Sequence, residues 1–229
     1  MIIVDDASTD ETAAIVKRLQ TGDERIQLLQ NEKNMRAAVS RNEGIQKSKG
    51  QYIAFLDSDD LWFSDKLEKQ LAFMKSRKAS FSCASYEVVD ENDQTTGKQV
   101  IMLPESDYHT FLEHNLLQTV GIMVDASVVP ISLLHMPSLT LCEDAATWLQ
   151  ILKAGYPCLG IQEILCQYRH SMRSLSGNKL KSSKALWHVY REVERLPVTY
   201  CCYCFIRYAL LAVWKRLPTL RKKKAGRRR

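Results

Sequence analysis

The first half of the chain alternates short apolar runs with amphipathic segments. Each apolar run is bounded by polar turn residues, which is typical of buried strands, and the segments between them have apolar side chains at helical spacing. The predicted strands are residues 1–4, 26–29, 52–56 and 81–89, and the predicted helices are residues 10–21, 37–48 and 64–78. Strands that alternate with helices of about 10 to 15 residues indicate βαβ units and a parallel sheet.

The pattern changes after residue 90, where the apolar runs become shorter and less regular. Strands are predicted at residues 100–103, 121–124, 158–161 and 165–168, and helices near 108–115 and at 143–154 and 179–196. A polar loop at residues 169–178 contains Arg169, His170 and Arg173. These cations could close over a phosphate, or the loop could simply be solvated.

The C-terminal part combines an apolar stretch with a cluster of cations. Residues 198–214 are apolar except for Thr199 and Arg207, and nine Lys and Arg residues follow without an acid among them. An apolar stretch of this length with a central arginine is marginal for a bilayer span, so we expect a helix in the membrane interface. Each surface Lys or Arg adds about 1 kcal/mol of attraction to anionic lipid. The alternative is a helix packed on the core, with a solvated tail.

The charge distribution argues against a nucleic-acid-binding protein. The 229 residues include 32 Lys and Arg and 26 Asp and Glu, a formal net charge of +6. Without the nine C-terminal cations, 26 acidic residues outnumber 23 basic ones. A basic body would have indicated nucleic acid, and this body is mildly acidic. The seven cysteines show no zinc-type spacing and fit a reducing compartment.

Acidic side chains follow two of the predicted strands. Asp57, Asp59 and Asp60 come directly after the third strand, and Asp5 and Asp6 follow the first. Ligands of open α/β sheets bind at the carboxyl ends of strands, so the two groups can share one crevice. Three carboxylates in four residues repel one another, and a divalent cation such as Mn²⁺ or Mg²⁺ would neutralise them. The alternative is a polar turn in which Asp60 caps the next helix.

Several segments carry motifs in a fixed order along the chain. They are IIVDDASTD at residues 2–10, RNEGI at 41–45, GQYIAFLDSDD at 50–60, and Glu143–Asp144 followed by Trp148. In this order they resemble the IIVDDGSTD, ARNxGI, GxYIAFLDSDD and ED motifs of the family 2 glycosyltransferases, which have the Rossmann-like GT-A fold. The resemblance covers residues 1–170. Residues 168–192 are similar to bacterial glycosyltransferases of the teichuronic-acid type.

The resemblance implies a role for four carboxylates. Asp6 would contact the uracil of a nucleotide sugar, and Asp57 would reach the ribose. Asp59, the second Asp of the DxD motif, would bind the metal that bridges the diphosphate, which gains charge as it leaves. Asp144 would be the general base that deprotonates the acceptor hydroxyl. Attack opposite the leaving group would invert the anomeric centre.

The chain departs from the family pattern in two places. The family begins with another strand and helix, carrying an IIPxYN-like segment, before the segment that matches residues 2–10. We therefore expect an N-terminally truncated sheet, with a gap of about 4.8 Å or a neighbouring strand that closes it. Where the family often has Gly-Gly, this chain has Met35–Arg36. Arg36 could approach the donor diphosphate, or it could be a surface arginine.

Together these observations predict a metal-dependent, inverting glycosyltransferase. Its fold is α/β, a GT-A fold with a mostly parallel sheet flanked by helices. We expect residues 1–178 to form the transferase domain, residues 179–217 to form membrane-associating helices, and residues 218–229 to form a basic tail. The donor would be a nucleotide-diphosphate sugar, expected to be a UDP-sugar. The acceptor would be a glycan or lipid-linked molecule of bacterial cell-envelope polysaccharide synthesis, met at the cytoplasmic face of the membrane.

Two alternatives stay open from the sequence. The first is a catalytically silent, truncated remnant that acts as a membrane-associated binding protein. The second is a nucleotidyltransferase, which shares the logic of carboxylates and metal. It ranks last because no Gly-rich phosphate loop with a lysine is found near the start of the sequence.

Overall fold

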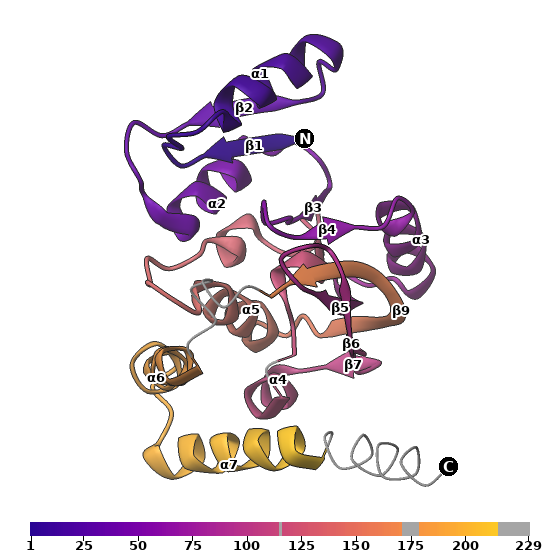
Figure 1. Cartoon of the computed structure of the whole chain (residues 1–229). Coiled ribbons are helices and arrows are strands. Elements are labelled where there is room, and N and C mark those ends of the chain that lie inside the picture. Colours follow the sequence, from indigo (N-terminus) through magenta and orange to yellow (C-terminus); the bar gives the residue numbers. More distant parts are fainter. Residues whose placement is uncertain (115, 171–178, 215–229) are drawn as a thin grey trace, which may run out of the picture.

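The structure is a computed structural model that describes residues 1–114, 116–170 and 179–214 (Figure 1). The described strands are β1 (Ile2–Asp5), β2 (Gln27–Gln30), β3 (Tyr52–Ala54), β4 (Leu61–Trp62), β5 (Phe81–Val89), β6 (Thr95–Val100), β7 (Glu105–Ser106), β8 (Ile122–Asp125) and β9 (Cys158–Arg169). The described α-helices are α1 (Thr12–Gly22), α2 (Arg36–Lys47), α3 (Lys66–Arg77), α4 (Tyr108–His114), α5 (Glu143–Lys153), α6 (Lys179–His188) and α7 (Val198–Trp214). Short 3₁₀ helices lie at Thr119–Gly121 and Ile131–Leu134, and a π-helical segment lies at Val189–Val193.

The first two strands form a small sheet of their own at one end of the molecule (Figure 1). β1 and β2 pair in parallel, with Ile2 opposite Gln27 and Asp5 opposite Gln30. α1 and α2 pack against this pair. The next strand along the chain, β3, pairs with β8, so β1 and β3 belong to different sheets. The sheet is therefore interrupted between β1 and β3, and an interruption was one of the two outcomes that the sequence left open.

The larger sheet is mixed, which corrects the expectation of a mostly parallel sheet. Its strand order is β3-β8-β5-β9-β4, with β6 paired to β5 and β7 paired to β9. Among the described strands of this sheet, β5 and β9 pair in parallel and all other pairs are antiparallel. The chain turns straight back from β5 into β6, and so short a connection can join only antiparallel neighbours. The α/β class is confirmed.

Three elements of the second half differ from the sequence prediction. The strand expected at residues 100–103 lies earlier, as β6, because it pairs with β5 in a hairpin. The two short strands expected at 158–161 and 165–168 are one strand, β9, which follows β5 through two register shifts. The helix expected at 179–196 is α6 followed by the π-helical segment.

The core lies between α5 and the larger sheet. Trp148 of α5 is fully buried, and its ring lies 5.7 Å from that of Phe55 and 5.9 Å from that of Phe81. Removing a buried aromatic side chain of this kind costs about 3 to 5 kcal/mol. This packing fixes where the N-terminus of α5, with Glu143 and Asp144, meets the end of β3.

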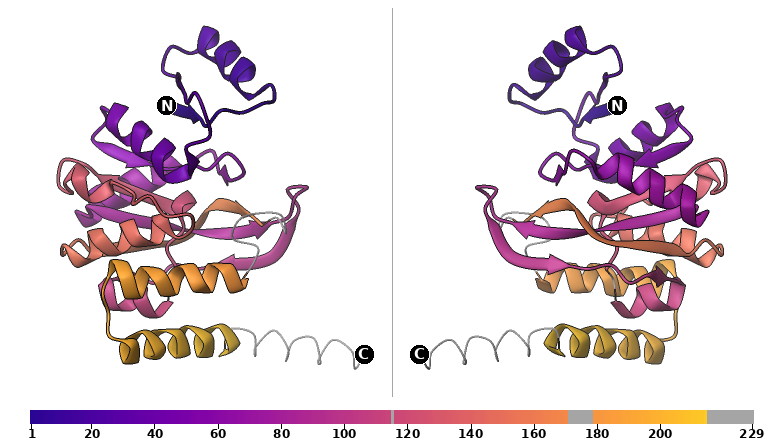
Figure 2. Two further views of the ribbon diagram at one scale, coloured as in Figure 1. Left: turned by 90° about the vertical axis from the view of Figure 1, so that its left-hand side faces the viewer. Right: turned by 90° about the vertical axis from the view of Figure 1, so that its right-hand side faces the viewer.

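The C-terminal helices lie at the opposite end of the molecule from β1 and β2 (Figures 1 and 2). α7 packs against α4, and Arg207 forms an ion pair with Glu113 at 3.2 Å. Cys201 and Cys204 point into the core, whereas Cys202 on the other side of the helix is exposed. None of the helices in the described ranges is long and apolar enough to cross a membrane. The predicted basic tail lies outside the described residues.

Candidate functional site

Asp6 holds the N-terminus of α2. Its Oδ1 accepts hydrogen bonds from Asn31 Nδ2 at 2.8 Å and from the Met35 amide at 2.7 Å. Its Oδ2 accepts from the Arg36 amide at 2.8 Å. Burial acts to raise the pKa of Asp6, but these donors outweigh burial and hold the pKa below its ordinary value. α2 has no side-chain cap of its own, so Asp6 satisfies amides that would otherwise lack a partner.

Arg36 has an unusual backbone conformation. Its φ is 72°, in the left-handed region that favours glycine, which gives a physical reason why a glycine suits this position. Its exposed side chain donates from Nη1 to Thr140 Oγ1 at 3.0 Å. Arg36 therefore connects the start of α2 with the segment that leads into α5.

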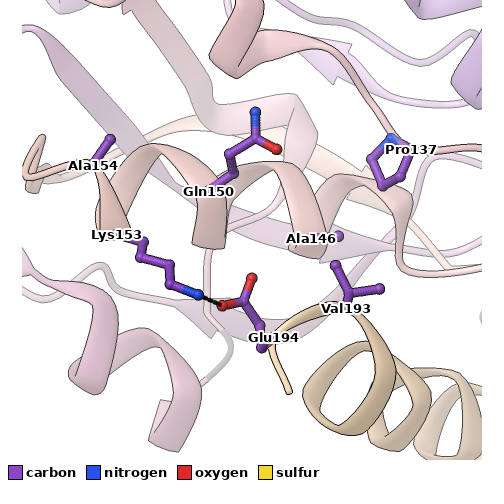
Figure 3. Close-up of a pocket in the computed structure, with 7 residues that line it drawn as sticks. All are labelled: Pro137, Ala146, Gln150, Lys153, Ala154, Val193 and Glu194. Carbon is purple, nitrogen blue, oxygen red and sulfur yellow. Dashed lines mark hydrogen bonds and ion pairs between the residues drawn. The ribbon is translucent and has the colours of Figure 1, made fainter. Parts of the chain in front are cut away.

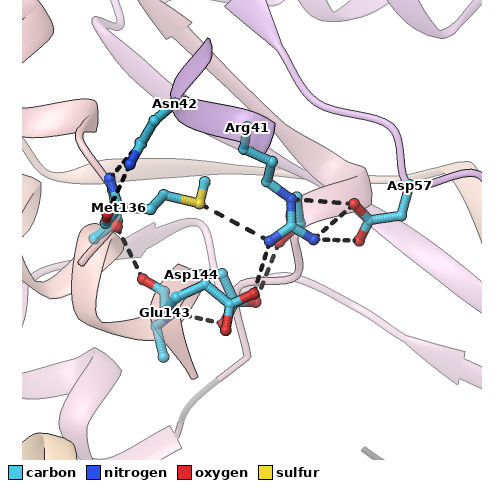
Figure 4. Close-up of polar contacts among 9 residues, drawn as sticks. Arg41, Asn42, Asp57, Met136, Glu143 and Asp144 are labelled. Atoms are coloured by element: carbon cyan, nitrogen blue, oxygen red, sulfur yellow. Dashed lines mark hydrogen bonds and ion pairs between the residues drawn. The ribbon is translucent and has the colours of Figure 1, made fainter. Parts of the chain in front are cut away.

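Arg41 joins three elements of the candidate site (Figure 4). Its guanidinium donates to both carboxylate oxygens of Asp57, which follows β3, at 2.7 and 2.8 Å. It also donates from Nη1 to Glu143 at the start of α5, at 2.9 Å. The side chains of Arg41 and Glu143 are 18% and 13% exposed, so the cluster is largely shielded from water. No role for Arg41 was predicted from the sequence, although it lies in the RNEGI motif.

The charges in this cluster shift one another. Burial by itself lowers the pKa of Arg41, but the carboxylates of Asp57, Asp144 and Glu143 together outweigh burial and hold that pKa above its ordinary value. Burial raises the pKa of Glu143, and the charge of Asp144 adds to this effect. A buried guanidinium between carboxylates is stable only while those carboxylates stay ionised. The charge states of Arg41, Asp57 and Glu143 therefore depend on one another.

Asn42, beside Arg41, locks the same two segments together. Its Nδ2 donates to the Met136 carbonyl and its Oδ1 accepts from the Met136 amide, both at 2.8 Å (Figure 4). This pair of bonds holds the irregular segment before α5 against α2. Arg41 and Asn42 of the motif therefore set the distance between the α2 and α5 parts of the site.

Asp144 lies next to Glu143 but in a different environment. Its Oδ1 accepts from the Ala145 amide at 2.7 Å, and its Oδ2 accepts from Thr119 Oγ1 at 3.1 Å. The side chain is half-buried and makes no ion pair with any described residue. Both oxygens keep a lone pair, so Asp144 can accept a proton while Glu143 is bound to Arg41.

The acidic loop after β3 separates its carboxylates. Asp59 is exposed, and its carboxylate has no hydrogen bond or ion pair within the part of the chain that the structure describes. Asp60 is buried and accepts from the Arg169 amide at 2.9 Å. The expectation that Asp60 caps the next helix is wrong, because Asp65 stands at the start of α3. Burial, with added repulsion from Asp59 and Asp57, raises the pKa of Asp60 to about 7.

Arg169 connects this loop to the β5–β6 hairpin. Its Nε donates to the Asp59 carbonyl at 2.7 Å, and its Nη2 pairs with Asp93 at 2.7 Å. Arg169 ends β9 and is 23% exposed on its side chain, so it is a support for the acidic loop and not part of a solvated loop. Arg173, predicted beside it, lies outside the described residues.

The residues present fit a metal held by a single carboxylate. Asp57 is engaged with Arg41, which leaves Asp59 as the available oxygen ligand. The described residues contain no group of three His, Cys, Asp or Glu that could hold a metal ion alone. Mg²⁺-type ions commonly bind through one or two carboxylates together with substrate phosphates and water, and one carboxylate satisfies that pattern.

A separate hollow of about 420 Å³ lies on the outer side of α5 (Figure 3). Gln150 and Lys153 of α5 line it, together with Val193, which ends the π-helical segment, and Glu194 directly after it. Lys153 and Glu194 form an ion pair at 2.8 Å across one end. None of the residues that the sequence singled out for chemistry lines this hollow.

Comparison with known proteins assigns the chain to a family. The model of the family described as "Glycosyl transferase family 2" matches residues 1–128, more than half of the chain. The chain belongs to glycosyltransferase family 2. The site described above therefore lies in a glycosyltransferase, and the predicted resemblance is confirmed.

Curated relatives match nearly the whole of this family 2 glycosyltransferase. TuaG of Bacillus subtilis (strain 168), named for teichuronic acid biosynthesis, is 43% identical over 218 residues, 95% of this chain and 85% of that protein. WfgD of Escherichia coli is 34% identical over 218 residues, 94% of this chain and 82% of that protein. WfgD is described as a UDP-Glc:α-D-GlcNAc-diphosphoundecaprenol β-1,3-glucosyltransferase.

Solved structures confirm the GT-A fold of this glycosyltransferase. TarS of S. aureus, in complex with UDP-GlcNAc, has a TM-score of 0.68 at 15% identity and covers 91% of this chain. The mannosyltransferase PcManGT from Pyrobaculum calidifontis, in complex with GDP-Man and Mn²⁺, has a TM-score of 0.63 at 15% identity. This chain spans 62% of the TarS chain and 59% of the PcManGT chain.

Proposed function

We propose that this protein transfers a sugar from a nucleotide-diphosphate donor, a UDP-sugar, to a glycan or lipid-linked acceptor. The acceptor belongs to bacterial cell-envelope polysaccharide synthesis. The observation that carries the proposal is the link that Arg41 makes between the acidic loop after β3 and the start of α5. Arg41 binds Asp57, two residues before the exposed Asp59, and Glu143, directly before Asp144. The descriptions of TuaG and WfgD support the substrate classes.

In this proposal Asp144 is the catalytic base. As the acceptor oxygen forms its bond to the anomeric carbon, its proton passes to a free lone pair of Asp144. The bond from the anomeric carbon to the diphosphate breaks on the opposite face, which inverts that centre. Glu143 is the less suitable base because Arg41 holds its carboxylate.

The remaining residues hold the donor. Asp59 would bind Mn²⁺ or Mg²⁺, which when bound neutralises the charge that develops on the leaving diphosphate. Asp57 contacts the ribose and Arg36 approaches the diphosphate. Asp6 contacts uracil through Oδ2, which accepts only one hydrogen bond from α2 and keeps a lone pair. Asp6 binds the amide of Arg36 and Asp57 binds the side chain of Arg41, and these two residues are five positions apart in α2. Five residues correspond to about 7.5 Å along the helix axis, which is compatible with one bound nucleotide.

Replacing Asp59 tests donor binding directly. We expect UDP with Mn²⁺ to raise the Tm of the wild-type chain, because a ligand at 100 times its Kd adds about 2.7 kcal/mol of stability. Asp59→Ala should lose most of this gain, and the control Glu24→Ala, which removes an exposed carboxylate before β2, should keep it. A UDP-dependent shift that survives Asp59→Ala would contradict the metal role.

The same experiment addresses the silent-remnant alternative, which the comparisons do not favour. A wild-type chain whose Tm does not respond to UDP, UDP-GlcNAc or UDP-glucose with Mn²⁺ would support a protein without donor binding. The nucleotidyltransferase alternative finds no support in the family match.

We also propose that the protein works at the cytoplasmic face of the membrane, bound to an anionic lipid surface. Tyr203, Ile206 and Leu210 share the outer side of α7 and are 46%, 59% and 61% exposed. Nine cations follow this helix in the sequence. An exposed apolar face beside clustered positive charge is typical of helices that lie in the interface of an anionic bilayer.

A further inference from the structure

We infer that Thr119 is a positioning residue that holds the Asp144 carboxylate in place for the acceptor. This inference rests on the proposed role of Asp144 as the base. Thr119 belongs to the 3₁₀ helix before β8 and lies 25 positions away from Asp144 in the sequence. No motif of the sequence singled it out.

The contact is specific to one oxygen of the carboxylate. Thr119 is 3% exposed, and its Oγ1 lies 3.1 Å from Asp144 Oδ2. An ionised carboxylate can only accept, so the threonine hydroxyl donates this hydrogen bond. The other oxygen, Oδ1, accepts from the Ala145 amide at 2.7 Å. With one donor on each oxygen, the plane of the carboxylate is fixed and each oxygen keeps a lone pair.

The 3₁₀ helix that carries Thr119 is itself held rigidly. Trp62 Nε1 donates to the Val120 carbonyl at 2.8 Å, and Gln70 Nε2 donates to the Gly121 carbonyl at 2.9 Å. A Cβ on Gly121 would lie 2.6 Å from the Ala84 carbonyl oxygen, so this turn sits directly on β5. Thr119 is therefore anchored to the larger sheet independently of α5.

Glu143, the other acid at the start of α5, is held by a different side chain. Arg41 fixes Glu143 from the α2 side, and it has no hydrogen bond to Asp144 among the described contacts. Each carboxylate thus has its own support, Arg41 for Glu143 and Thr119 for Asp144. The charge of Arg41 also acts on Asp144 through space. The described side-chain hydrogen bond to Asp144 comes from a neutral hydroxyl, and each oxygen keeps a lone pair that can accept a proton.

The test compares three variants of this chain of 229 residues. Thr119→Val removes the hydroxyl at nearly constant volume, and Thr119→Ser keeps it. The matched control is Thr147→Val, because Thr147 is fully buried in α5 and its hydroxyl donates to the Glu143 carbonyl at 2.9 Å. UDP release from UDP-glucose with Mn²⁺ and a GlcNAc-diphospholipid acceptor reports kcat and KM.

We expect Thr119→Val to lower kcat by about 10- to 100-fold, the scale on which misplaced catalytic groups act, with donor KM changed less than twofold. Thr119→Ser should restore kcat, and Thr147→Val should stay close to wild type. In an Asp144→Asn background, Thr119→Val should cause no further loss, because it acts through Asp144. An equal loss in both backgrounds would overturn the inference.

A second measurement does not depend on turnover. Labelling of carboxylates with a carbodiimide and glycine ethyl ester, followed by peptide mass spectrometry, reports how free each side chain is. We expect faster labelling of Asp144 in Thr119→Val than in wild type or Thr119→Ser, with buried Asp125 as the internal reference. Unchanged labelling of Asp144 would overturn the inference. Wild-type turnover in Asp144→Asn would instead overturn the proposed base, which separates the two failures.

Discussion

At the scale of single residues, the sequence identifies acids in motifs but not the groups that hold them. Asp57, Asp59 and Asp144 were predicted because their residue type, their spacing and the family motifs agree. Arg41 and Thr119 were not assigned roles, since their partners lie up to 102 positions away and no local pattern encodes such a contact. Their roles depend on how the elements pack.

Lys66 is a residue that the sequence places on an ordinary helix and that the structure buries. It is fully buried, and its Nζ finds no hydrogen-bond partner in the described part of the chain. The ammonium lies 3.8 Å from the centre of the Trp62 ring, which compensates only part of the loss of water. Burial lowers the pKa of Lys66 to about 8.

We predict that Lys66→Met stabilises the protein at pH 7 by about 3 kcal/mol, since burial lowers the pKa from 10.5 to about 8 and one pKa unit corresponds to about 1.4 kcal/mol. Between pH 8 and pH 10.5 the unfolded chain still binds the Lys66 proton, while the folded chain has lost it. The free energy of unfolding of the wild-type protein therefore rises with pH over this range. The advantage of the variant should shrink over that range. Urea unfolding of both proteins at pH 7 and pH 10 measures this, and a constant difference would contradict it.

At the scale of elements, the βαβ pattern of the first half was predictable, but the pairing of the second half was not. Antiparallel β8 lies between β3 and β5, and β9 reaches from β5 to β4. Strand partners depend on chain connections, which apolar periodicity does not specify. The acidic loop was correctly located at a strand end, whereas its support by β9 and the β5–β6 hairpin required the structure.

Arg169 is the residue through which β9 and the hairpin hold the acidic loop. We predict that Arg169→Lys lowers the affinity for UDP with Mn²⁺ by about tenfold, because lysine lacks the planar fork that reaches both Asp59 and Asp93. The backbone hydrogen bond to Asp60 should remain. Isothermal titration measures the affinity, with Arg25→Lys as control, since Arg25 pairs with Asp23 in an exposed turn. Equal UDP affinity in Arg169→Lys and wild type would refute this support role.

At the scale of the whole molecule, the small β1–β2 sheet lies at one end and α7 lies at the other (Figure 2). The candidate site extends from Asp6, directly after β1, to Asp144 at the start of α5. The sequence predicted either a gap or a closing strand beside the first strand, and a last helix either in the membrane interface or packed on the core. It could not predict which side of α7 would pack on α4. That depends on tertiary contacts such as the ion pair of Arg207 with Glu113.

We predict binding to vesicles that contain phosphatidylglycerol and weak binding to pure phosphatidylcholine. Replacing Tyr203, Ile206 and Leu210 together by Ser should weaken binding by at least tenfold, since burying each large apolar side chain contributes about 1.5 to 3 kcal/mol. The control replaces Val128 and Ile131 by Ser, because both are equally exposed elsewhere on the surface. Co-sedimentation measures this, and equal binding by the triple variant would contradict the membrane role of α7.

The central claim is that Asp144 and not its neighbour Glu143 accepts the proton of the acceptor during sugar transfer. The most direct test is kcat for UDP release from UDP-glucose, with Mn²⁺ and a GlcNAc-diphospholipid acceptor, in Asp144→Asn and Glu143→Gln. Asp144→Asn should lower kcat by about 10²- to 10⁴-fold, the usual contribution of a general base. Glu143→Gln should lose far less, because glutamine can still accept the hydrogen bond from Arg41. A large loss in Glu143→Gln with turnover retained in Asp144→Asn would contradict the account.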